Sequence, residues 1–262
     1  MKGKSVFIYD VYAPTSITTM LRPRQQEGQS IIHEAFHIEP SVAFSEYIDI
    51  YGNTCQRATL PVGEVTIITE VKAQVEETEA ITNPKPGFVP IADLPDNVMH
   101  FILPSRYCQS DLNDINQLAL QITANVNPGY DQVEAIRKWI NQNVTYQYGF
   151  SDSSTTAFDI AHNRIGVCRD FTHLAIALCR NLCIPARMTV GYLDKLKVTD
   201  LHAWFEAYIG DEWYTFDAVQ EKTEGYRIQI AHGRDAADVA MVTQYGNTSL
   251  RSLEVTTELI NA

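Results

Sequence analysis

The chain has 262 residues, of which 45% are hydrophobic, enough to bury a full core as one large domain or two smaller ones. Its formal net charge of −12 argues against nucleic acid or an anionic membrane as the main partner. Five cysteines are an odd number without a paired framework, so at least one is free, as in a reducing compartment or a reactive thiol.

The N-terminus lacks the pattern of a secretory signal. The apolar run at residues 6–9 stops at Asp10, which is too short for the hydrophobic part of a signal peptide. No stretch approaches the length of a membrane span. We therefore expect a soluble, cytoplasmic protein without membrane contact.

The first hundred residues have the composition of β-strands, with Val, Ile, Thr, Tyr and Phe in short runs between turn signals. Six strands are predicted, at residues 5–12, 17–21, 31–38, 43–51, 55–60 and 64–75. Short strands at this spacing are typical of an antiparallel sandwich. We find no chemistry in this region.

His33 and His37 lie four residues apart on the predicted third strand, where they share a face with Ala35. No carboxylate or cysteine stands at ligand spacing from them. We expect a structural or exposed role for both rather than a metal site.

A passage rich in proline, residues 83–95, is the predicted linker. It divides the chain into an N-terminal β-sandwich region, 1–98, and a core, 99–262. Apolar residues at helical spacing predict helices at 111–124 and 131–144. A polar loop then leads to a short helix predicted at 157–164.

Cys168 stands at the predicted start of the next helix. Phe171 and Leu174 open one buried helix face, Gly166 breaks the chain before it, and Asp170 places a carboxylate in the first turn. Free backbone N–H groups and the helix dipole at that end favour thiolate over thiol, as a nucleophilic cysteine requires. The alternative is a small apolar residue that packs at a helix start.

Three alternating segments after this helix predict strands at 186–193, 202–209 and 213–219. Gly210-Asp211 predicts a tight hairpin between the last two. With a two-residue loop, Trp204 faces Asp217, and His202 then lies diagonal to Asp217 on the same side of the sheet. A loop of odd length would place His202 and Asp217 on opposite faces.

With this register, the chain carries a nucleophile at a helix start, a base on a strand and an acid on the neighbouring strand. In such a Cys-His-Asp arrangement the imidazole takes the thiol proton, and the carboxylate fixes its tautomer and stabilises its cation. Cys168, His202 and Asp217 are the candidate catalytic residues.

These residues resemble the transglutaminase-like superfamily of cysteine enzymes, most closely its bacterial cysteine protease branch. The matching motifs are Gly166-Val167-Cys168-Arg169-Asp170-Phe171-Thr172-His173-Leu174, Ile184-Pro185-Ala186-Arg187 with Gly191-Tyr192, His202-Ala203-Trp204-Phe205-Glu206, Trp213 to Phe216-Asp217, and Gly233-Arg234-Asp235 with Asp238-Val239. The close match covers residues 110–240, and Asp49-Ile50-Tyr51-Gly52-Asn53 is more weakly similar to the β region that precedes this core. The resemblance implies that Cys168 is the nucleophile, His202 the base and Asp217 the third member of a catalytic triad.

Three positions depart from the family's pattern. Cys183 stands where a glycine usually ends the nucleophile helix, and Ala218-Val219 follows Asp217 in place of the more usual Pro-Thr. Arg227 occupies a position often held by histidine. None of these removes a catalytic group, so they bear on substrate preference more than on activity.

The resemblance implies an α+β fold with a papain-like core, in which helices pack on an antiparallel sheet, preceded by the β-sandwich. The implied activity is hydrolysis of a peptide or side-chain amide bond through a thioester. The oxyanion would be held by the Cys168 N–H and a second donor: Tyr146, Tyr148 or a backbone amide. The alternatives are a transglutaminase, which transfers the acyl group to an amine, and a non-catalytic peptide-binding scaffold.

The expected substrate is a protein or peptide. No calcium-loop pattern is present, so we predict no required metal and no cofactor.

A structural role, such as core packing, is expected for the other four cysteines: Cys55, Cys108, Cys179 and Cys183. Arg234, Asp235 and Asp238 are expected to form a structural salt-bridge cluster. The sequence leaves the oligomeric state open.

Overall fold

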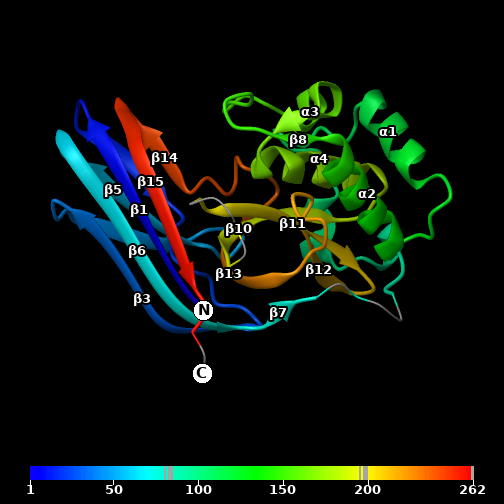
Figure 1. The fold of residues 1–262 in the computed structure, drawn as a ribbon, viewed down its shortest axis with the longest axis horizontal. Coiled ribbons are helices and arrows are strands. Elements are labelled where there is room, and N and C mark those ends of the chain that lie inside the picture. The colour runs from blue at the N-terminus through cyan, green and yellow to red at the C-terminus, as the bar shows by residue number, and fades with distance from the viewer. Residues whose placement is uncertain (80, 82–84, 195, 197–199, 261–262) are drawn as a thin grey trace.

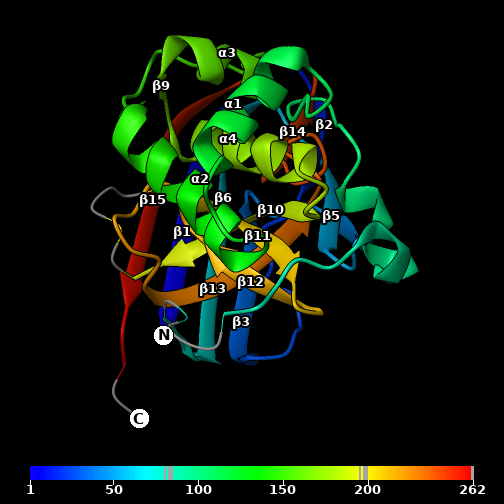
Figure 2. The same ribbon diagram turned by 90° about the vertical axis from the view of Figure 1, so that its right-hand side faces the viewer.

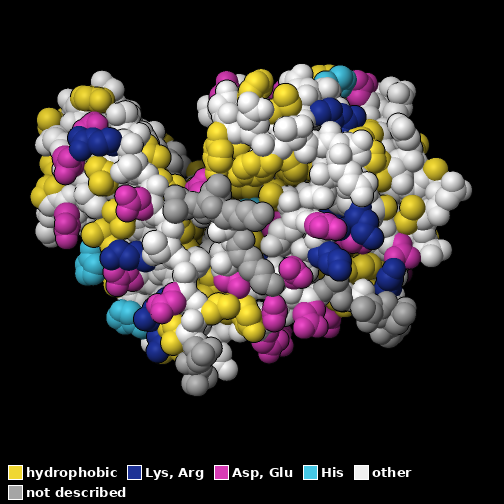
Figure 3. All heavy atoms as spheres, in the orientation of Figure 1, with side chains coloured by type: hydrophobic (Ala, Val, Ile, Leu, Met, Phe, Trp, Pro, Cys, Tyr) yellow, Lys and Arg dark blue, Asp and Glu magenta, His cyan; other side chains and the backbone are white. Residues whose placement is uncertain are grey.

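Three parts follow one another across the molecule in the computed structural model, which describes residues 1–79, 81, 85–194, 196 and 200–260. A sandwich of two four-stranded sheets comes first, then a five-stranded sheet, then a layer of helices (Figure 1, Figure 2). Figure 3 shows a notch between the sandwich and the helical side of the molecule, with apolar surface along the helical side.

The sandwich is antiparallel throughout, with strand orders β15-β1-β6-β3 and β14-β2-β5-β4. Along β1 and β6 nearly every second residue is buried, which is the alternation of a strand with one face on a core. The six predicted strands are all present, as β1 (Lys2–Val11), β2 (Thr15–Thr19), β3 (Gln29–Glu39), β4 (Phe44–Ile48), β5 (Thr54–Leu60) and β6 (Gly63–Val75).

The end of the chain completes the sandwich. β15 (Thr248–Glu258) pairs with β1 from Lys2 opposite Glu258 to Val11 opposite Thr248, and β14 (Val242–Tyr245) pairs with β2. The predicted division at residue 98 therefore separates strands that share a sheet.

The middle sheet has the order β12-β11-β10-β13-β7 and is also antiparallel. β10 (Ala186–Leu193) and β11 (His202–Ile209) have the predicted bounds, and β12 (Glu212–Phe216) is shorter than predicted. β13 (Gly225–Gly233) was not predicted, and it pairs with β7 (Glu77–Thr78), a short strand that follows the sandwich.

Helix α4 (Cys168–Asn181) is the central helix, buried along almost its whole length. It packs on β10 and β11 with one side and against the other helices with the other, so every face contacts protein. These helices are α1 (Asn113–Thr123), α2 (Tyr130–Asn143) and α3 (Ala157–Asn163), close to the predicted bounds. Among the described residues no helix is long and apolar enough to cross a bilayer.

The C-terminus of α4 explains the first departure from the family pattern. Cys183 has a φ of 59°, the left-handed conformation that usually requires glycine. The Ile184 N–H donates to the Cys179 carbonyl at 3.0 Å, and the Cys183 N–H donates to the Arg180 carbonyl at 2.9 Å. These two bonds form a Schellman motif, so the usual cap geometry is kept with a cysteine in the glycine position.

The motif from Asp49 to Asn53 joins the sandwich to the middle sheet. The Asn53 side chain is fully buried, donates to Asp49 and to the His232 carbonyl, each at 2.8 Å, and accepts from the His232 N–H at 3.0 Å. It also accepts from Arg24 at 2.7 Å. All four hydrogen-bonding positions of the amide are therefore used.

Residues 83 and 84 of the predicted linker lie outside the described residues. Residues 85–90 have no regular secondary structure, and two short 3-10 helices follow, η1 (Ile91–Asp93) and η2 (Asp96–Phe101).

Candidate active site

Cys168 is the first residue of α4 and is half-buried. Asp170, fully buried in the first turn, accepts from the Val167 N–H at 2.9 Å and so caps the helix. The Cys168 backbone N–H is left free of intrahelical bonding, and the Tyr146 hydroxyl lies near it. The thiol thus sits where the N-terminal end of the helix favours an anion.

The hairpin of β11 and β12 has the even register that the sequence predicts. Ile209 lies opposite Glu212, and Phe205 lies opposite Phe216. His202 and Asp217 consequently share one face of the sheet, and the imidazole Nε2 lies 2.7 Å from Asp217 Oδ2. Both side chains are buried.

His202 also interacts with Cys168, which links the helix start to the hairpin. Burial lowers the pKa of His202, but the charge and hydrogen bond of Asp217 and the hydrogen bond and charge of Cys168 outweigh it and raise that pKa to about 10. Since Nε2 is held by Asp217, Nδ1 is the nitrogen left for the thiol. The site therefore favours a protonated imidazole at neutral pH.

Backbone and side-chain donors fix the Asp217 carboxylate. Its Oδ1 accepts from the Val219 N–H at 3.0 Å, and its Oδ2 accepts from Arg227 at 3.3 Å. The backbone N–H of Asp217 donates separately to the Thr223 hydroxyl at 2.9 Å. Burial raises the pKa of Asp217, but the charge and hydrogen bond of His202 and the charge of Arg227 bring it below its usual value. Because the bond to Oδ1 comes from a backbone amide, the Ala218-Val219 departure leaves this contact in place.

Trp204 covers the imidazole of His202. Its ring stacks on His202 with centroids 6.2 Å apart, and the side chain is 2% exposed. Gly191 makes room for the indole, because a Cβ there would lie 3.0 Å from a ring carbon of Trp204 and 2.1 Å from the Ile228 carbonyl oxygen. Trp204 therefore shields His202 from water.

Two tyrosines lie beside the thiol. The Tyr146 hydroxyl donates to the Tyr148 hydroxyl at 3.3 Å, and Tyr148 donates in turn to Asp200 at 3.3 Å. Burial and the charge of Cys168 raise the pKa of Tyr146, so its hydroxyl keeps its proton. Of the three donors considered from sequence, Tyr146 is the side chain that meets the Cys168 N–H.

Arg169 ties the helix start to the polar loop before α3. It donates to Asp170 at 2.8 Å and to the Asp152 carbonyl at 2.6 Å. Asp170 therefore caps α4 and, through Arg169, also holds the loop.

The remaining candidates have structural surroundings. Cys55, Cys108 and Cys179 are fully buried, and burial raises the pKa of each thiol. Arg234 pairs with Asp238 at 2.8 Å, whereas Asp235 accepts from the Tyr107 and Ala237 backbone N–H groups.

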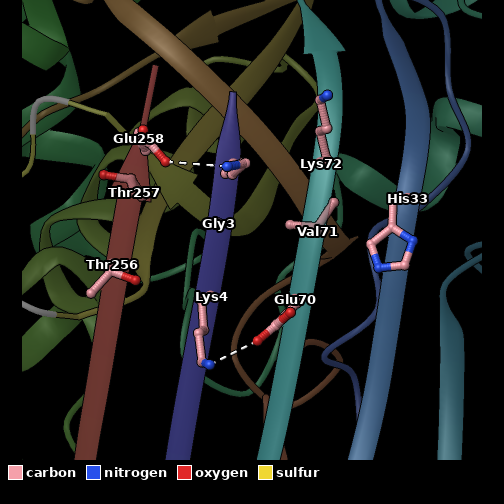
Figure 4. Close-up of a pocket in the computed structure, with 10 residues that line it drawn as sticks. Gly3, Lys4, His33, Glu70, Val71, Lys72, Thr256, Thr257 and Glu258 are labelled. Carbon is pink, nitrogen blue, oxygen red and sulfur yellow. Dashed lines mark hydrogen bonds and ion pairs between the residues drawn. The ribbon is translucent and has the colours of Figure 1, made fainter. Parts of the chain in front are cut away.

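His33 and His37 are exposed on β3. Figure 4 shows His33 at the edge of a hollow on the outer face of the sandwich, where Lys4 pairs with Glu70 on the neighbouring strands. Within the described ranges no group of three or more His, Cys, Asp or Glu side chains could hold a metal ion.

The contacts of Arg227 and Thr223 with Asp217 were not found from sequence. Both residues come from the loop and strand after Asp217, and Arg227 was singled out only as a departure from the family pattern. Thr223 and Arg227 follow Asp217 by six and ten residues, and no sequence pattern in this loop indicates that it turns both side chains toward Asp217.

Known proteins are similar to this chain in its N-terminal strands and in the region that carries Cys168, His202 and Asp217. The transglutaminase-like superfamily model matches residues 116–218, and that of the bacterial transglutaminase-like N-terminal region matches residues 9–76. A crystal structure of a putative cysteine protease from Cytophaga hutchinsonii matches with a TM-score of 0.89 and 35% identity, over 99% of this chain and 91% of that chain. An uncharacterized protein of Mycobacterium leprae is 27% identical over 271 residues, 97% of this chain and 95% of that protein.

Proposed function

The chain belongs to the transglutaminase-like superfamily, and on that premise we propose that it is a thiol-dependent hydrolase of peptide or side-chain amide bonds, with Cys168, His202 and Asp217 as its catalytic residues. The observation that carries the proposal is the 2.7 Å contact of His202 with Asp217, made while His202 also interacts with a thiol at a helix N-terminus. The substrate is a protein or a peptide.

In the first half of the reaction, the Cys168 thiolate attacks the amide carbonyl carbon, and a C–S bond forms as the carbonyl electron pair moves onto oxygen. His202, protonated at Nδ1, then gives its proton to the departing amine as the C–N bond breaks. A thioester and a neutral imidazole remain. In the second half, His202 takes a proton from water as its oxygen attacks the thioester carbon. The C–S bond then breaks, the acid leaves, and the Cys168 thiolate is regenerated beside the protonated imidazole.

The oxyanion of each tetrahedral intermediate is held by the Cys168 N–H and the Tyr146 hydroxyl. These two groups lie near each other, so both can donate to an oxygen placed between them. We expect Tyr146→Phe to slow turnover by about 10-fold or more while iodoacetamide labelling of Cys168 is unchanged, because the thiolate forms without this hydroxyl.

The proposal is tested by labelling the full chain with iodoacetamide from pH 4 to 9 and mapping the modified cysteines by mass spectrometry. Cys183, also partly exposed, is an internal reference thiol. We expect Cys168 to label much faster than Cys183 below pH 7, and His202→Ala to remove the difference. Equal rates for the two cysteines would contradict the proposal and favour the non-catalytic peptide-binding scaffold.

The acceptor of the acyl group distinguishes a hydrolase from a transglutaminase. Both share the thioester, and they differ in whether water or an amine attacks it. Incubation with a glutamine-containing protein and a labelled primary amine separates them. Release of ammonia without incorporation of the amine supports the hydrolase, whereas incorporation at Gln side chains would replace it with the transglutaminase.

A further inference from the structure

Arg227 contacts both Asp217 and Trp204, the two side chains that lie against His202. Its Nη2 donates to Asp217 Oδ2 at 3.3 Å, and this is the same oxygen that lies 2.7 Å from His202 Nε2. The guanidinium centre is 5.6 Å from the centre of the Trp204 ring, and that ring stacks on His202. The Arg227 side chain is 5% exposed, so little water reaches its contact with Asp217.

The other hydrogen bonds of Arg227 go to neutral acceptors. Nη2 donates to the Gln220 side chain at 2.7 Å, and Nη1 donates to the carbonyls of Glu224 and Gly225 at 3.2 and 3.3 Å. Over the part of the chain that the structure describes, Nε is buried with no hydrogen-bond partner. A buried guanidinium with these neighbours depends on Asp217 to balance its charge.

We propose that Arg227 is a positioning residue of this site: it fixes the Asp217 carboxylate against His202 and, through its charge, sets the pH above which His202 gives up its proton. This inference rests on the proposed Cys168–His202–Asp217 arrangement. The hydrogen bond of Arg227 within this site goes to Asp217, so it acts on His202 through Asp217.

The physical reason is that one carboxylate lies between two cations. Asp217 stabilises the His202 imidazolium, while the permanent charge of Arg227 offsets part of the Asp217 charge. His202 therefore loses its proton at a lower pH than it would beside Asp217 alone. A base that releases its proton more readily suits the second half of the reaction, in which His202 must be neutral to take a proton from water.

Other charged groups also face this pair. Cys168 approaches His202 from α4, and Asp200 acts on it from the residues before β11. Asp194, at the end of β10, acts on Arg227. All three stay in place when only position 227 is changed, so a difference between variants at that position reports the Arg227 charge.

The experiment is an NMR titration of the His202 ring in the full chain carrying Cys168→Ser, which removes the thiol next to the ring. Arg227→Gln and Arg227→His, the second of which installs the residue often found at this position in the family, both remove the charge at alkaline pH. We expect each to move the His202 titration midpoint upward by roughly one pH unit, and Arg227→Lys to leave it within a few tenths. The two charge-removing variants give two independent readings should one of them fold poorly.

An unchanged or lowered midpoint in the Gln and His variants would overturn the proposal, because Arg227 would then serve only to bind the 224–225 carbonyls or to hold the loop. The same upward shift in Arg227→Lys would also overturn it, since the charge would not be the cause. Arg234→Gln is the matched control, because Arg234 pairs with Asp238 away from the site, and it should leave the midpoint unchanged. A failure of the hydrolase proposal would appear instead as His202→Ala leaving Cys168 labelling unaltered.

Discussion

The imidazole of His202 and the carboxylate of Asp217 meet at 2.7 Å between two adjacent strands, with both side chains buried. A buried histidine would ordinarily lose its charge, because burial disfavours the cation. The neighbouring carboxylate reverses this effect and raises the pKa of His202 to about 10 together with Cys168. The charge state of the imidazole at neutral pH therefore depends on Asp217.

Asp217→Asn should lower the pKa of His202, because an amide can still accept a hydrogen bond but carries no charge. Less imidazolium then stabilises the Cys168 thiolate, and we expect iodoacetamide labelling of Cys168 at pH 6 to slow by about 10-fold or more. Asp235→Asn is the matched control, since Asp235 is also buried but bonds to backbone N–H groups elsewhere. Labelling at the wild-type rate in Asp217→Asn would contradict this role.

The placement of His202 and Asp217 on one face of the sheet could be predicted from sequence, because it depends only on whether the hairpin loop has an even or an odd number of residues. A two-residue Gly210-Asp211 loop fixes which residues of the hairpin share a face, and the observed register agrees. The start of α4 was predictable for a similar reason, since Gly166 and Asp170 mark a helix start within a few residues of Cys168.

Two kinds of contact are missed from sequence: those between distant strands, and those that depend on the path of a loop. β15 joins β1 across almost the whole chain. Arg227 is only ten residues from Asp217, and it meets Asp217 because of the path that the loop between β12 and β13 takes. The Asn53 amide binds the backbone of His232, which is 179 residues away. Local composition and periodicity carry no information about such partners, so neither the closed sandwich nor the full surroundings of Asp217 could be predicted.

Cys183→Gly should stabilise the protein by about 0.5–1 kcal/mol. A side chain at a φ of 59° is strained, and glycine relieves that strain while losing more chain entropy on folding. The free energy of unfolding from urea titrations measures the change. Cys183→Ala keeps a Cβ and should show no gain, so equal stabilisation by Ala and Gly would mean that removal of the thiol, rather than relief of backbone strain, is responsible.

Gly191→Ala should destabilise the protein by about 2–4 kcal/mol and disturb the cover over His202. The new Cβ would lie 2.1 Å from the Ile228 carbonyl oxygen, and a backbone atom in a sheet cannot move away cheaply. Trp204 fluorescence would report the movement of the indole. Gly87→Ala is the control, since nothing lies within 4 Å of a Cβ there, and it should change stability little. A Gly191→Ala variant as stable as wild type would show that the sheet adjusts more easily than these distances allow.

His173 should make the protein less stable as the pH falls below neutral. It is fully buried, stacks on Tyr107 with centroids 5.1 Å apart, and its Nε2 accepts from the Ala236 N–H at 3.1 Å. Burial lowers the pKa of His173 to about 4, with a smaller opposing contribution from the charge of Asp235. The unfolded chain, with an ordinary histidine pKa near 6.5, therefore binds a proton between about pH 6.5 and 4 that the folded protein does not.

This difference costs up to about 3 kcal/mol of stability as the pH falls from 6.5 to 4, and the loss levels off below that range. His173→Gln keeps an acceptor for the Ala236 N–H but cannot titrate, so urea unfolding should show a flatter dependence of stability on pH in this window. Part of the slope should remain, because burial also lowers the pKa of His232, to about 2. The control is His33→Gln, on the exposed face of β3, which should keep the wild-type dependence of stability on pH. If His173→Gln showed that same dependence, His173 would take up its proton without unfolding of the protein.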